Sequence, residues 1–306
     1  MYKDACKWKL DVPMPDSVRH LNVSPTIPEL NCRVVFSAVS SPVAYEIEEL
    51  FASNGYIVVS NASAHRMEPD IPLIIPEVNP DHLNIINQQK IKRNYDRGFI
   101  VTNPNCSTIP LAMVLAPVKE HFGISKAIVT TLQAISVAGY PGVPALDIFD
   151  NIIPNIKNEE EKIESETPKI LGKYGGDRFI PYEIDISAKV HRVAVCDGHL
   201  LSVSVKTSRK ADIEEIKKIL KGFSGYIGVY NLPGAPEKPI IVRNEMDRPQ
   251  PRLDRNAGNG MSVVVGRIQL CSVLDFKMSI LVHNTIRDAA GAAILNAELI
   301  KAKGYV

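Results

Sequence analysis

Short apolar runs and a helical repeat alternate in the first third of the chain. Residues 33–39 read Arg-Val-Val-Phe-Ser-Ala-Val and residues 56–60 read Tyr-Ile-Val-Val-Ser. Between them, residues 42–54 repeat apolar positions at the spacing of one helix face. The order strand, helix, strand is typical of a parallel sheet with helices packed on it. We therefore expect the chain to begin its fold as an α/β protein.

The pattern changes after about residue 122, where longer strand-like runs alternate between apolar and polar positions. Alternation indicates strands with one face solvated or packed on helices, which favours a mostly antiparallel sheet in an α+β domain. The further strands expected are 99–101, 127–136, 184–195, 200–207, 260–268 and 276–282, and the further helices are 80–93, 107–122, 157–171, 212–222 and one long helix at 283–303.

Composition argues against a nucleic-acid-binding protein, a membrane-spanning protein and a metal-binding protein. The 306 residues carry a net charge of +1 with no basic tract, which argues against nucleic acid as a partner. No apolar run approaches the roughly 20 residues that cross a bilayer, and the N-terminus lacks the apolar core of a signal peptide. The five cysteines are scattered without the spacing of a zinc or redox site. We expect a cytoplasmic protein without a metal centre.

One cysteine lies in a setting that favours chemistry. Residues 103–108 read Asn-Pro-Asn-Cys-Ser-Thr, between an expected strand and an expected helix. A helix N-terminus carries partial positive charge, which lowers the pKa of a nearby thiol. Most free cysteines act as small buried hydrophobes. The setting nevertheless makes Cys106 the leading candidate for a covalent nucleophile.

Several motifs in the same order resemble the aspartate-semialdehyde dehydrogenase family, in particular its archaeal and fungal branch. Besides the cysteine motif, these are Leu-Gln-Ala-Ile-Ser at 132–136, Asn-Glu-Glu-Glu-Lys at 158–162, Asp-Gly-His at 197–199 and His-Asn-Thr-Ile-Arg at 283–287. The resemblance covers nearly the whole chain. It implies that NADPH reduces L-aspartyl-4-phosphate to aspartate semialdehyde and phosphate through a thioester on Cys106, in lysine, methionine and threonine biosynthesis.

The resemblance also implies a domain organisation. A Rossmann-like, NADP-binding domain would comprise residues 1–105 and 283–306, and a catalytic and dimerisation domain would comprise residues 106–282. The expected assembly is a homodimer or homotetramer.

The partners of the thiol follow from the same resemblance. A thiol that attacks an acyl phosphate needs a base that later acts as an acid, and a histidine with a pKa near 6.5 suits both tasks. His199 matches this base, and the preceding Asp197-Gly198 pair predicts a hairpin turn. Gln133 would orient the thioester carbonyl, and the planar fork of Arg192 would bind the substrate α-carboxylate.

The remaining contacts are also assigned by position. Glu160 would hold the α-amine, a choice that depends on its spacing from Lys162. The residues expected to meet the phosphate are Lys162, Arg66 and Asn105, and those expected to contact NADP are Ser37, Ser40, Asn61, Gly139 and Asn284.

Two features depart from the family pattern. Nothing before Arg33 resembles the Gly-rich turn that cradles a cofactor pyrophosphate. The chain therefore resembles the enzyme without its first few dozen residues, and a misplaced start codon is favoured over a truncation or a degenerate paralogue. Residues 33–39 would then form an open sheet edge. The second departure is Val137, where the family commonly has glycine and a β-branched residue would strain or crowd the site.

Three alternatives remain at this point. The same thioester chemistry serves malonyl-CoA reductase and N-acetylglutamyl-phosphate reductase. A catalytically silent paralogue that acts as an assembly partner is the third, although Cys106, Gln133, Arg192 and His199 are all retained. The arginine-rich loop at 247–255 is interpreted as a solvated or intersubunit loop without a catalytic role.

Overall fold

The computed structural model describes residues 1–10, 12–225 and 230–306, which divide into the units Met1–Asn31 and Cys32–Val306. The described residues of the first unit form the single-turn helices α1 (Tyr2–Ala5) and α2 (Asp16–Arg19), neither of which has a buried residue. All the predicted site residues lie in the second unit, which contains both sheets of interest.

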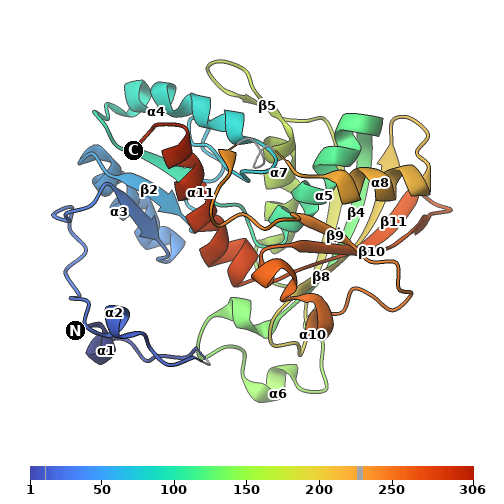
Figure 1. Ribbon diagram of the computed structural model, residues 1–306, viewed down its shortest axis with the longest axis horizontal. Coiled ribbons are helices and arrows are strands. Elements are labelled where there is room, and N and C mark those ends of the chain that lie inside the picture. The colour runs from blue at the N-terminus through green and yellow to red at the C-terminus, as the bar shows by residue number, and fades with distance from the viewer. Residues whose placement is uncertain (11, 226–229) are drawn as a thin grey trace. The chain divides into compact units, whose positions relative to one another are not determined.

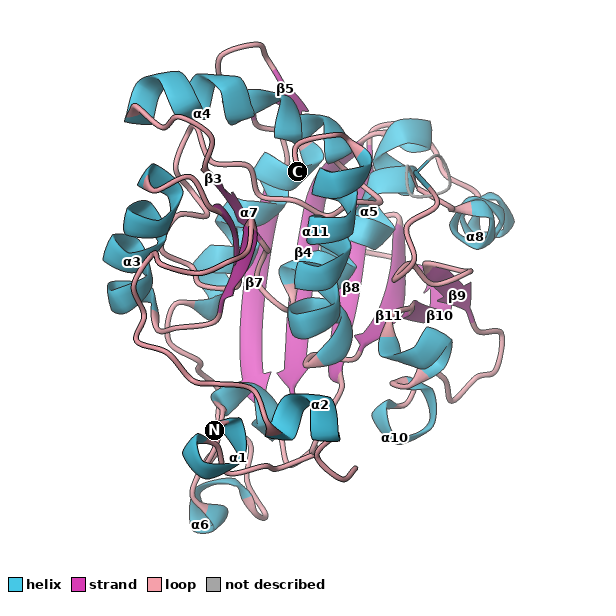
Figure 2. Cartoon of the chain, turned by 60° about the vertical axis from the view of Figure 1, so that its left-hand side comes forward, coloured by secondary structure: helices cyan, strands magenta, loops and turns pink. Residues whose placement is uncertain are grey.

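A three-stranded parallel sheet opens the second unit, with the order β1-β2-β3. Ile57 and Val59 of β2 pack in one apolar cluster with residues of α11, while Val58 packs in another with Phe51 of α3. Helices thus cover both faces (Figures 1 and 2), which explains why β2 and β3 are buried along their whole length. The bounds are β1 Val34–Ser37, α3 Ser41–Ser53, β2 Ile57–Ser60, β3 Phe99–Thr102 and α11 Gly291–Ala302.

The open edge expected at residues 33–39 is present. Among the described strands, β1 pairs only with β2, in register from Val34 opposite Ile57 to Ser37 opposite Ser60. Phe36 on this edge strand is 54% exposed.

A six-stranded mixed sheet forms the larger core, with the order β7-β4-β8-β11-β10-β9. The three inner pairings, from β4 to β10, are antiparallel, and the two outer pairings are parallel. The prediction of an α/β part plus a mostly antiparallel α+β part is confirmed. The strands are β4 Ile124–Gln133, β7 Asp185–Arg192, β8 His199–Thr207, β9 Ile240–Val242, β10 Val263–Leu270 and β11 Phe276–Val282.

One face of this sheet is covered by helices that share its apolar cluster. They are α5 (Thr108–Phe122), α7 (Glu159–Leu171) and α8 (Ile213–Gly222). On the opposite face β4 presents Lys126, Ile128 and Thr130. Figure 2 shows the long strands β7, β4 and β8 side by side.

The predicted hairpin before His199 is wrong. Strands β7 and β8 are not neighbours, because β4 lies between them, parallel to β7 and antiparallel to β8. The Asp197-Gly198 pair therefore belongs to a connection that passes the end of β4. A local turn signal cannot reveal that an earlier strand is inserted between two consecutive ones.

The predicted long helices are interrupted. Residues 80–93 divide into a 3₁₀ segment, η1 (Pro80–Ile85), and α4 (Ile86–Arg93). The closing helix begins only after residue 285, with a π-helical turn, η4 (Ile286–Ala290), that leads into α11. π-helical turns occur frequently at functional sites.

Several short elements were not predicted, because too few residues carry a pattern. They are η2 (Ile135–Ala138), α6 (Ala145–Ile148), β5 (Lys173–Tyr174), β6 (Phe179–Ile180), α10 (Pro251–Asp254) and η3 (Ala257–Gly260). The arginine-rich loop is ordered around the buried Asp254, which pairs with Arg243 and Arg248.

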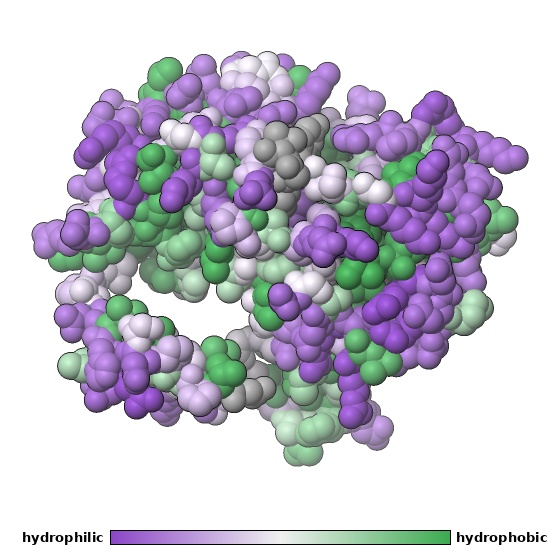
Figure 3. All heavy atoms as spheres, viewed as in Figure 1, coloured by the Kyte–Doolittle hydropathy of each residue, from purple (hydrophilic) through white to green (hydrophobic). Residues whose placement is uncertain are grey.

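The surface is ordinary for a protein with this composition. Hydrophilic and hydrophobic side chains are interspersed on the face shown in Figure 3. Within the described residues, every helix is too short or too polar to cross a membrane, and no cluster of His, Cys, Asp and Glu is suited to a metal ion.

Candidate active site

A cavity of about 320 Å³ lies where the carboxyl ends of β2 and β3 approach the start of α7 and the turn η4. Ligands of parallel α/β sheets bind beyond the carboxyl ends of the strands. The cavity is lined by Val39, Ser40, Ser41, Asn61, Ala62, Ser63, Arg66, Pro104, Asn105, Cys106, Val137, Glu159, Lys162, Asn284, Asp288 and Ala289.

Cys106 is half-buried in this cavity, one residue before Ser107, the N-cap of α5. Burial raises the pKa of its thiol above the ordinary range, and the carboxyl groups of Glu159 and Asp288 raise it further, while Arg66 and Lys162 act in the opposite direction. This direction is opposite to that predicted from the helix start. Without a ligand, burial and the two carboxyl groups favour the protonated form of the thiol.

Glu159, not Glu160, is the carboxylate of the cavity. Its Oε2 accepts a hydrogen bond from Asn105 Nδ2 at 2.7 Å, and its Oε1 pairs with Lys162 Nζ at 2.7 Å. Glu160 lies about 100° further round α7 and pairs instead with Lys189 of β7, at 3.2 Å. The cavity is thus lined by Glu159 and not by the predicted Glu160.

Arg66 supplies a second cation near Lys162. Its Nη1 pairs with Glu166 Oε1 at 3.0 Å and its Nη2 donates to the Asn61 carbonyl at 2.8 Å. Its Nε is buried and has no hydrogen-bond partner among the described residues. The cavity thus has a donor available for an anionic group.

At one end of the six-stranded sheet, the ends of three strands bring together Gln133, Arg192 and His199. Gln133 ends β4 opposite Arg192, which ends the parallel strand β7, and His199 begins the antiparallel strand β8. The backbone of Ala134 links two of them: its carbonyl accepts from Arg192 Nη1 at 2.9 Å, and its N–H donates to His199 Nδ1 at 3.1 Å.

Two observations connect this group to the thiol. Gln133 Nε2 donates to the hydroxyl of Ser107, the residue after Cys106, at 3.0 Å. Burial lowers the pKa of Arg192, whereas Cys106 and Glu159 raise it. The guanidinium therefore lies within electrostatic range of the thiol and of the cavity carboxylate.

The hydrogen bond at His199 determines its tautomer. Because Nδ1 accepts from a backbone N–H, the ring proton lies on Nε2, which is buried and has no partner among the described residues. Burial, Arg192 and His283 lower the pKa of His199 to about 3. In this geometry the neutral ring of His199 carries a hydrogen-bond donor at Nε2, and its role as the catalytic base stays a prediction.

Comparison with known proteins shows the family. Residues 2–86 match the semialdehyde dehydrogenase NAD binding domain, and residues 115–287 match the semialdehyde dehydrogenase dimerisation domain. An aspartate-semialdehyde dehydrogenase from Archaeoglobus fulgidus is 49% identical, over 98% of this chain and 86% of that protein. The chain belongs to the aspartate-semialdehyde dehydrogenase family.

Two further relatives bear on the cofactor and the substrate. The crystal structure of aspartate semialdehyde dehydrogenase with NADP from Candida albicans has a TM-score of 0.90 and 43% identity, and covers 100% of this chain and 88% of that one. A malonyl CoA reductase (NADP) from Metallosphaera sedula is 38% identical, over 100% of this chain and 87% of that protein. The resemblance found in the sequence is confirmed.

The cavity suits the nicotinamide end of the cofactor named in that family structure. Ser40, the N-cap of α3, makes no side-chain capping bond, and both carboxyl oxygens of Asp288 are buried without a partner among the described residues. Hydroxyl, amide and phosphate groups of a nucleotide could satisfy these atoms together with Arg66 Nε. The residues present therefore fit such a group.

Three of the five residues predicted to contact NADP line the cavity that contains Cys106, and two do not. Ser40, Asn61 and Asn284 line the cavity. Gly139 lines a separate cavity of about 330 Å³ beside η2, and the Ser37 hydroxyl donates to Glu48.

Asn284 also forms hydrogen bonds with η2 and with the segment before His199. Its Nδ2 donates to Ser136 Oγ and its Oδ1 accepts from the Gly198 N–H, both at 2.8 Å.

Sequence reasoning missed Asp288, and of the two effects expected at Val137 the structure contradicts only the backbone strain, so crowding of the cofactor stays a prediction. Nothing in the spacing of residues 283–288 singles out Asp288, because its place in the cavity results from the π-helical turn η4. Val137 lies in η2 and is not among the residues with positive φ. Its side chain lines the cavity without that form of backbone strain.

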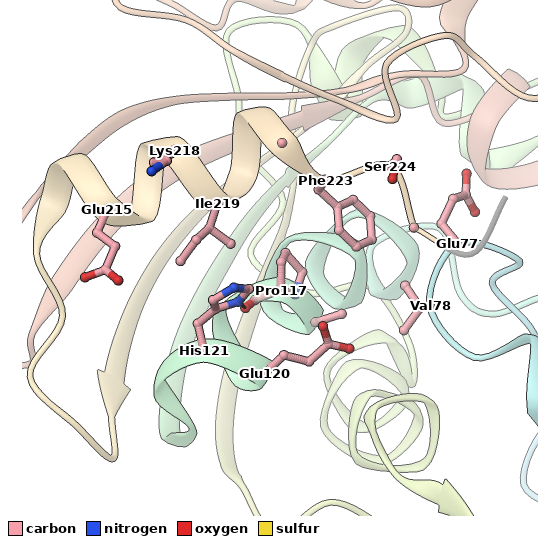
Figure 4. Close-up of a pocket in the computed structure, with 13 residues that line it drawn as sticks. Glu77, Val78, Pro117, Glu120, His121, Glu215, Lys218, Ile219, Phe223 and Ser224 are labelled. Carbon is pink, nitrogen blue, oxygen red and sulfur yellow. Dashed lines mark hydrogen bonds between the residues drawn. The ribbon is translucent and has the colours of Figure 1, made fainter. Parts of the chain in front are cut away.

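A larger cavity of about 610 Å³ contains none of the predicted site residues. It lies between α5 and α8, where Pro117 and His121 face Ile219 (Figure 4). The volume of a cavity therefore does not identify the active site of this family member.

Proposed function

We propose that this chain is an NADP-dependent aspartate-semialdehyde dehydrogenase, which forms aspartate semialdehyde and phosphate from L-aspartyl-4-phosphate. The observation that carries the proposal is the cavity in which Cys106 lies beside the cations Arg66 and Lys162 and the carboxylate Glu159. A thiol, an anion-binding pair and an ammonium-binding group are what a thioester route from this substrate requires.

Substrate binding follows from the charges around the thiol. The guanidinium of Arg192 takes the α-carboxylate, Glu159 takes the α-ammonium group, and Arg66 and Lys162 take the phosphoryl group. The substrate ammonium group offsets the negative field of Glu159 at Cys106. Substrate binding thus lowers the pKa of the thiol at the moment when a nucleophile is needed.

In the first chemical step the departing phosphate itself accepts the thiol proton. Cys106 Sγ forms a bond to the acyl carbon, the bond to the phosphate oxygen breaks, and the thiol proton ends on the departing phosphate. The His199 Nε2–H stabilises negative charge on the carbonyl oxygen. NADPH, when bound, supplies the hydride that turns the thioester into the aldehyde.

Glu159 favours this substrate over the alternatives. Glu159 loses Lys162 as its cationic partner when Lys162 contacts the phosphoryl group, and a buried carboxylate needs such a partner. Malonyl-CoA has no ammonium group, and acetylation removes the charge from the amine of N-acetylglutamyl phosphate. The contacts of Glu159 therefore support an amino-acid substrate.

The deciding experiment is the reduction of NADP by the purified chain with aspartate semialdehyde and phosphate. We expect turnover that disappears in Cys106→Ala, and little oxidation of NADPH with malonyl-CoA. Faster reaction with malonyl-CoA would reassign the substrate. Absence of turnover with every substrate, in a preparation that is folded and binds NADP, would support the silent paralogue.

The dimerisation domain indicates a homo-oligomer. We propose a cytoplasmic homodimer or homotetramer, with residues 1–105 and 283–306 as the cofactor domain and 106–282 as the catalytic and dimerisation domain. The uncovered face of the six-stranded sheet, where Ile128 is 48% exposed, is the proposed contact surface. Replacing Ile128 with Asp should shift the mass measured by light scattering towards the monomer.

A further inference from the structure

Asp288 is a carboxyl group of the cavity that has no partner. The residue is 5% exposed, and neither Oδ1 nor Oδ2 has a hydrogen-bond partner within residues 1–10, 12–225 and 230–306. The guanidinium of its neighbour Arg287 acts on it electrostatically but pairs with Glu77, at 2.7 Å. An unpaired buried carboxyl group destabilises a protein unless something else completes it.

The other charges of the cavity are already paired. Lys162 pairs with Glu159 at 2.7 Å, and Arg66 pairs with Glu166 at 3.0 Å. No cation of the described residues is therefore left for Asp288 within this cavity. A ligand that completes the site must bring a positive charge or hydrogen-bond donors.

The reaction proposed above identifies that ligand, and the inference depends on it. The thioester forms on Cys106, so the nicotinamide ring that exchanges a hydride with it must enter the same cavity. Asp288 acts electrostatically on Cys106 and therefore also on a group placed against the thiol. The oxidised ring carries a positive charge, whereas the reduced ring is neutral.

We propose that Asp288 is a specificity-determining residue that makes this chain bind oxidised NADP in preference to NADPH. Its carboxylate pairs with the cationic nicotinamide ring in the oxidised complex. The neutral ring of NADPH is bound without this ion pair, so its affinity does not depend on the charge of residue 288.

The proposal has a consequence for pH. Burial raises the pKa of Asp288 well above its ordinary value. Oxidised NADP binds the ionised form, so its affinity rises with pH and its binding releases a proton. The charged and titratable groups that act on the same cavity are Cys106 before α5, Glu159 and Lys162 on α7, Arg66 after β2 and Arg287 on η4.

Calorimetric titration of NADP and NADPH into three proteins tests the proposal: the unmodified chain, Asp288→Asn and Glu161→Gln. Glu161 is exposed, so its variant removes the same charge away from the cavity. For Asp288→Asn at pH 8.5 we expect NADP to bind about tenfold more weakly, a change that a charge contact at an effective dielectric constant of about 20 can produce. NADPH affinity should change less than about twofold, and the control should match the unmodified chain.

A second measurement keeps the proposal testable if the variant folds poorly. In a Cys106→Ser background, where the thiol cannot titrate, NADP affinity should still rise from pH 6.5 to pH 8.5 with release of a proton. Equal weakening of both nucleotides in Asp288→Asn, or pH-independent NADP binding in this background, would overturn the proposal. If neither nucleotide binds the unmodified chain, the proposed function itself fails.

Discussion

At the scale of single residues, the site is governed by which charges face the thiol. Cys106 shares the cavity with the carboxyl groups of Glu159 and Asp288, and both oppose its ionisation. The family chemistry requires a thiolate, which these two carboxyl groups disfavour in the protein without ligands. We interpret this as activation by the charge of the ligands and not by the helix terminus alone.

Alkylation of the thiol tests this interpretation. Replacing Glu159 with Gln removes one of the negative charges that raise the pKa of Cys106, so more thiolate forms at pH 8. We expect iodoacetamide to label Cys106 about tenfold faster, which corresponds to a shift of one pKa unit. The readout is the rate of carboxamidomethylation by mass spectrometry.

Glu160→Gln is the matched control, because it removes the same charge from the same helix on the side that faces Lys189. Its labelling rate should equal that of the unmodified chain. Faster labelling in both variants would mean that the two residues act equally on the thiol and that the assignment of Glu159 is wrong.

At the scale of elements, the positions of the strands depend on close approaches that only glycine permits. Gly98 precedes β3, and a Cβ atom there would lie 2.0 Å from the carbonyl oxygen of Ala52 in α3 and 2.7 Å from that of Tyr56. Both contacts are with backbone. The end of α3 and the strand β3 can therefore be adjacent only if residue 98 has no side chain.

Gly98→Ala should lower the free energy of unfolding by about 2 kcal/mol, the usual cost of overpacking a rigid site. Urea titration followed by circular dichroism measures the change. Gly222→Ala at the end of α8 is the control, because a Cβ there meets nothing within 4 Å. Equal stability of the two variants would show that α3 and β3 are less closely packed than described.

At the scale of the whole molecule, stability should depend on buried neutral histidines. Burial lowers the pKa of His82 to about 4 and, with Arg192 and His283, that of His199 to about 3. In the unfolded chain both have a pKa near 6.5. Above pH 6.5 both histidines are neutral in the folded and the unfolded chain, so they do not change stability with pH. Below about pH 6.5 the unfolded chain binds more protons than the folded chain, and stability falls as the pH drops.

Each such histidine contributes a slope of about 1.4 kcal/mol per pH unit between these limits. Unfolding free energies measured from pH 8 to pH 5 should fall less steeply for His199→Asn than for the unmodified chain. The exposed His20 provides the control variant. A slope unchanged by His199→Asn would mean that this histidine is charged in the folded protein.

The local pattern of apolar and polar residues was sufficient to predict many of the strands and helices of this protein. Strands β2, β3, β8 and β11 and helices α3, α7 and α8 lie within a few residues of their predicted positions, because apolar periodicity reflects which side of each element is buried. The cysteine motif also identified the thiol that lies in the cavity, and the family resemblance was confirmed.

Tertiary structure decided what depends on orientation and on distant neighbours. The insertion of β4 between β7 and β8 removed the expected hairpin and brought Gln133, Arg192 and His199 to one sheet edge. The rotation of α7 selected Glu159 over Glu160, and the π-helical turn brought Asp288 into the cavity. A sequence specifies which residues are present, but the field at a side chain depends on groups that only the folded chain brings within a few ångströms.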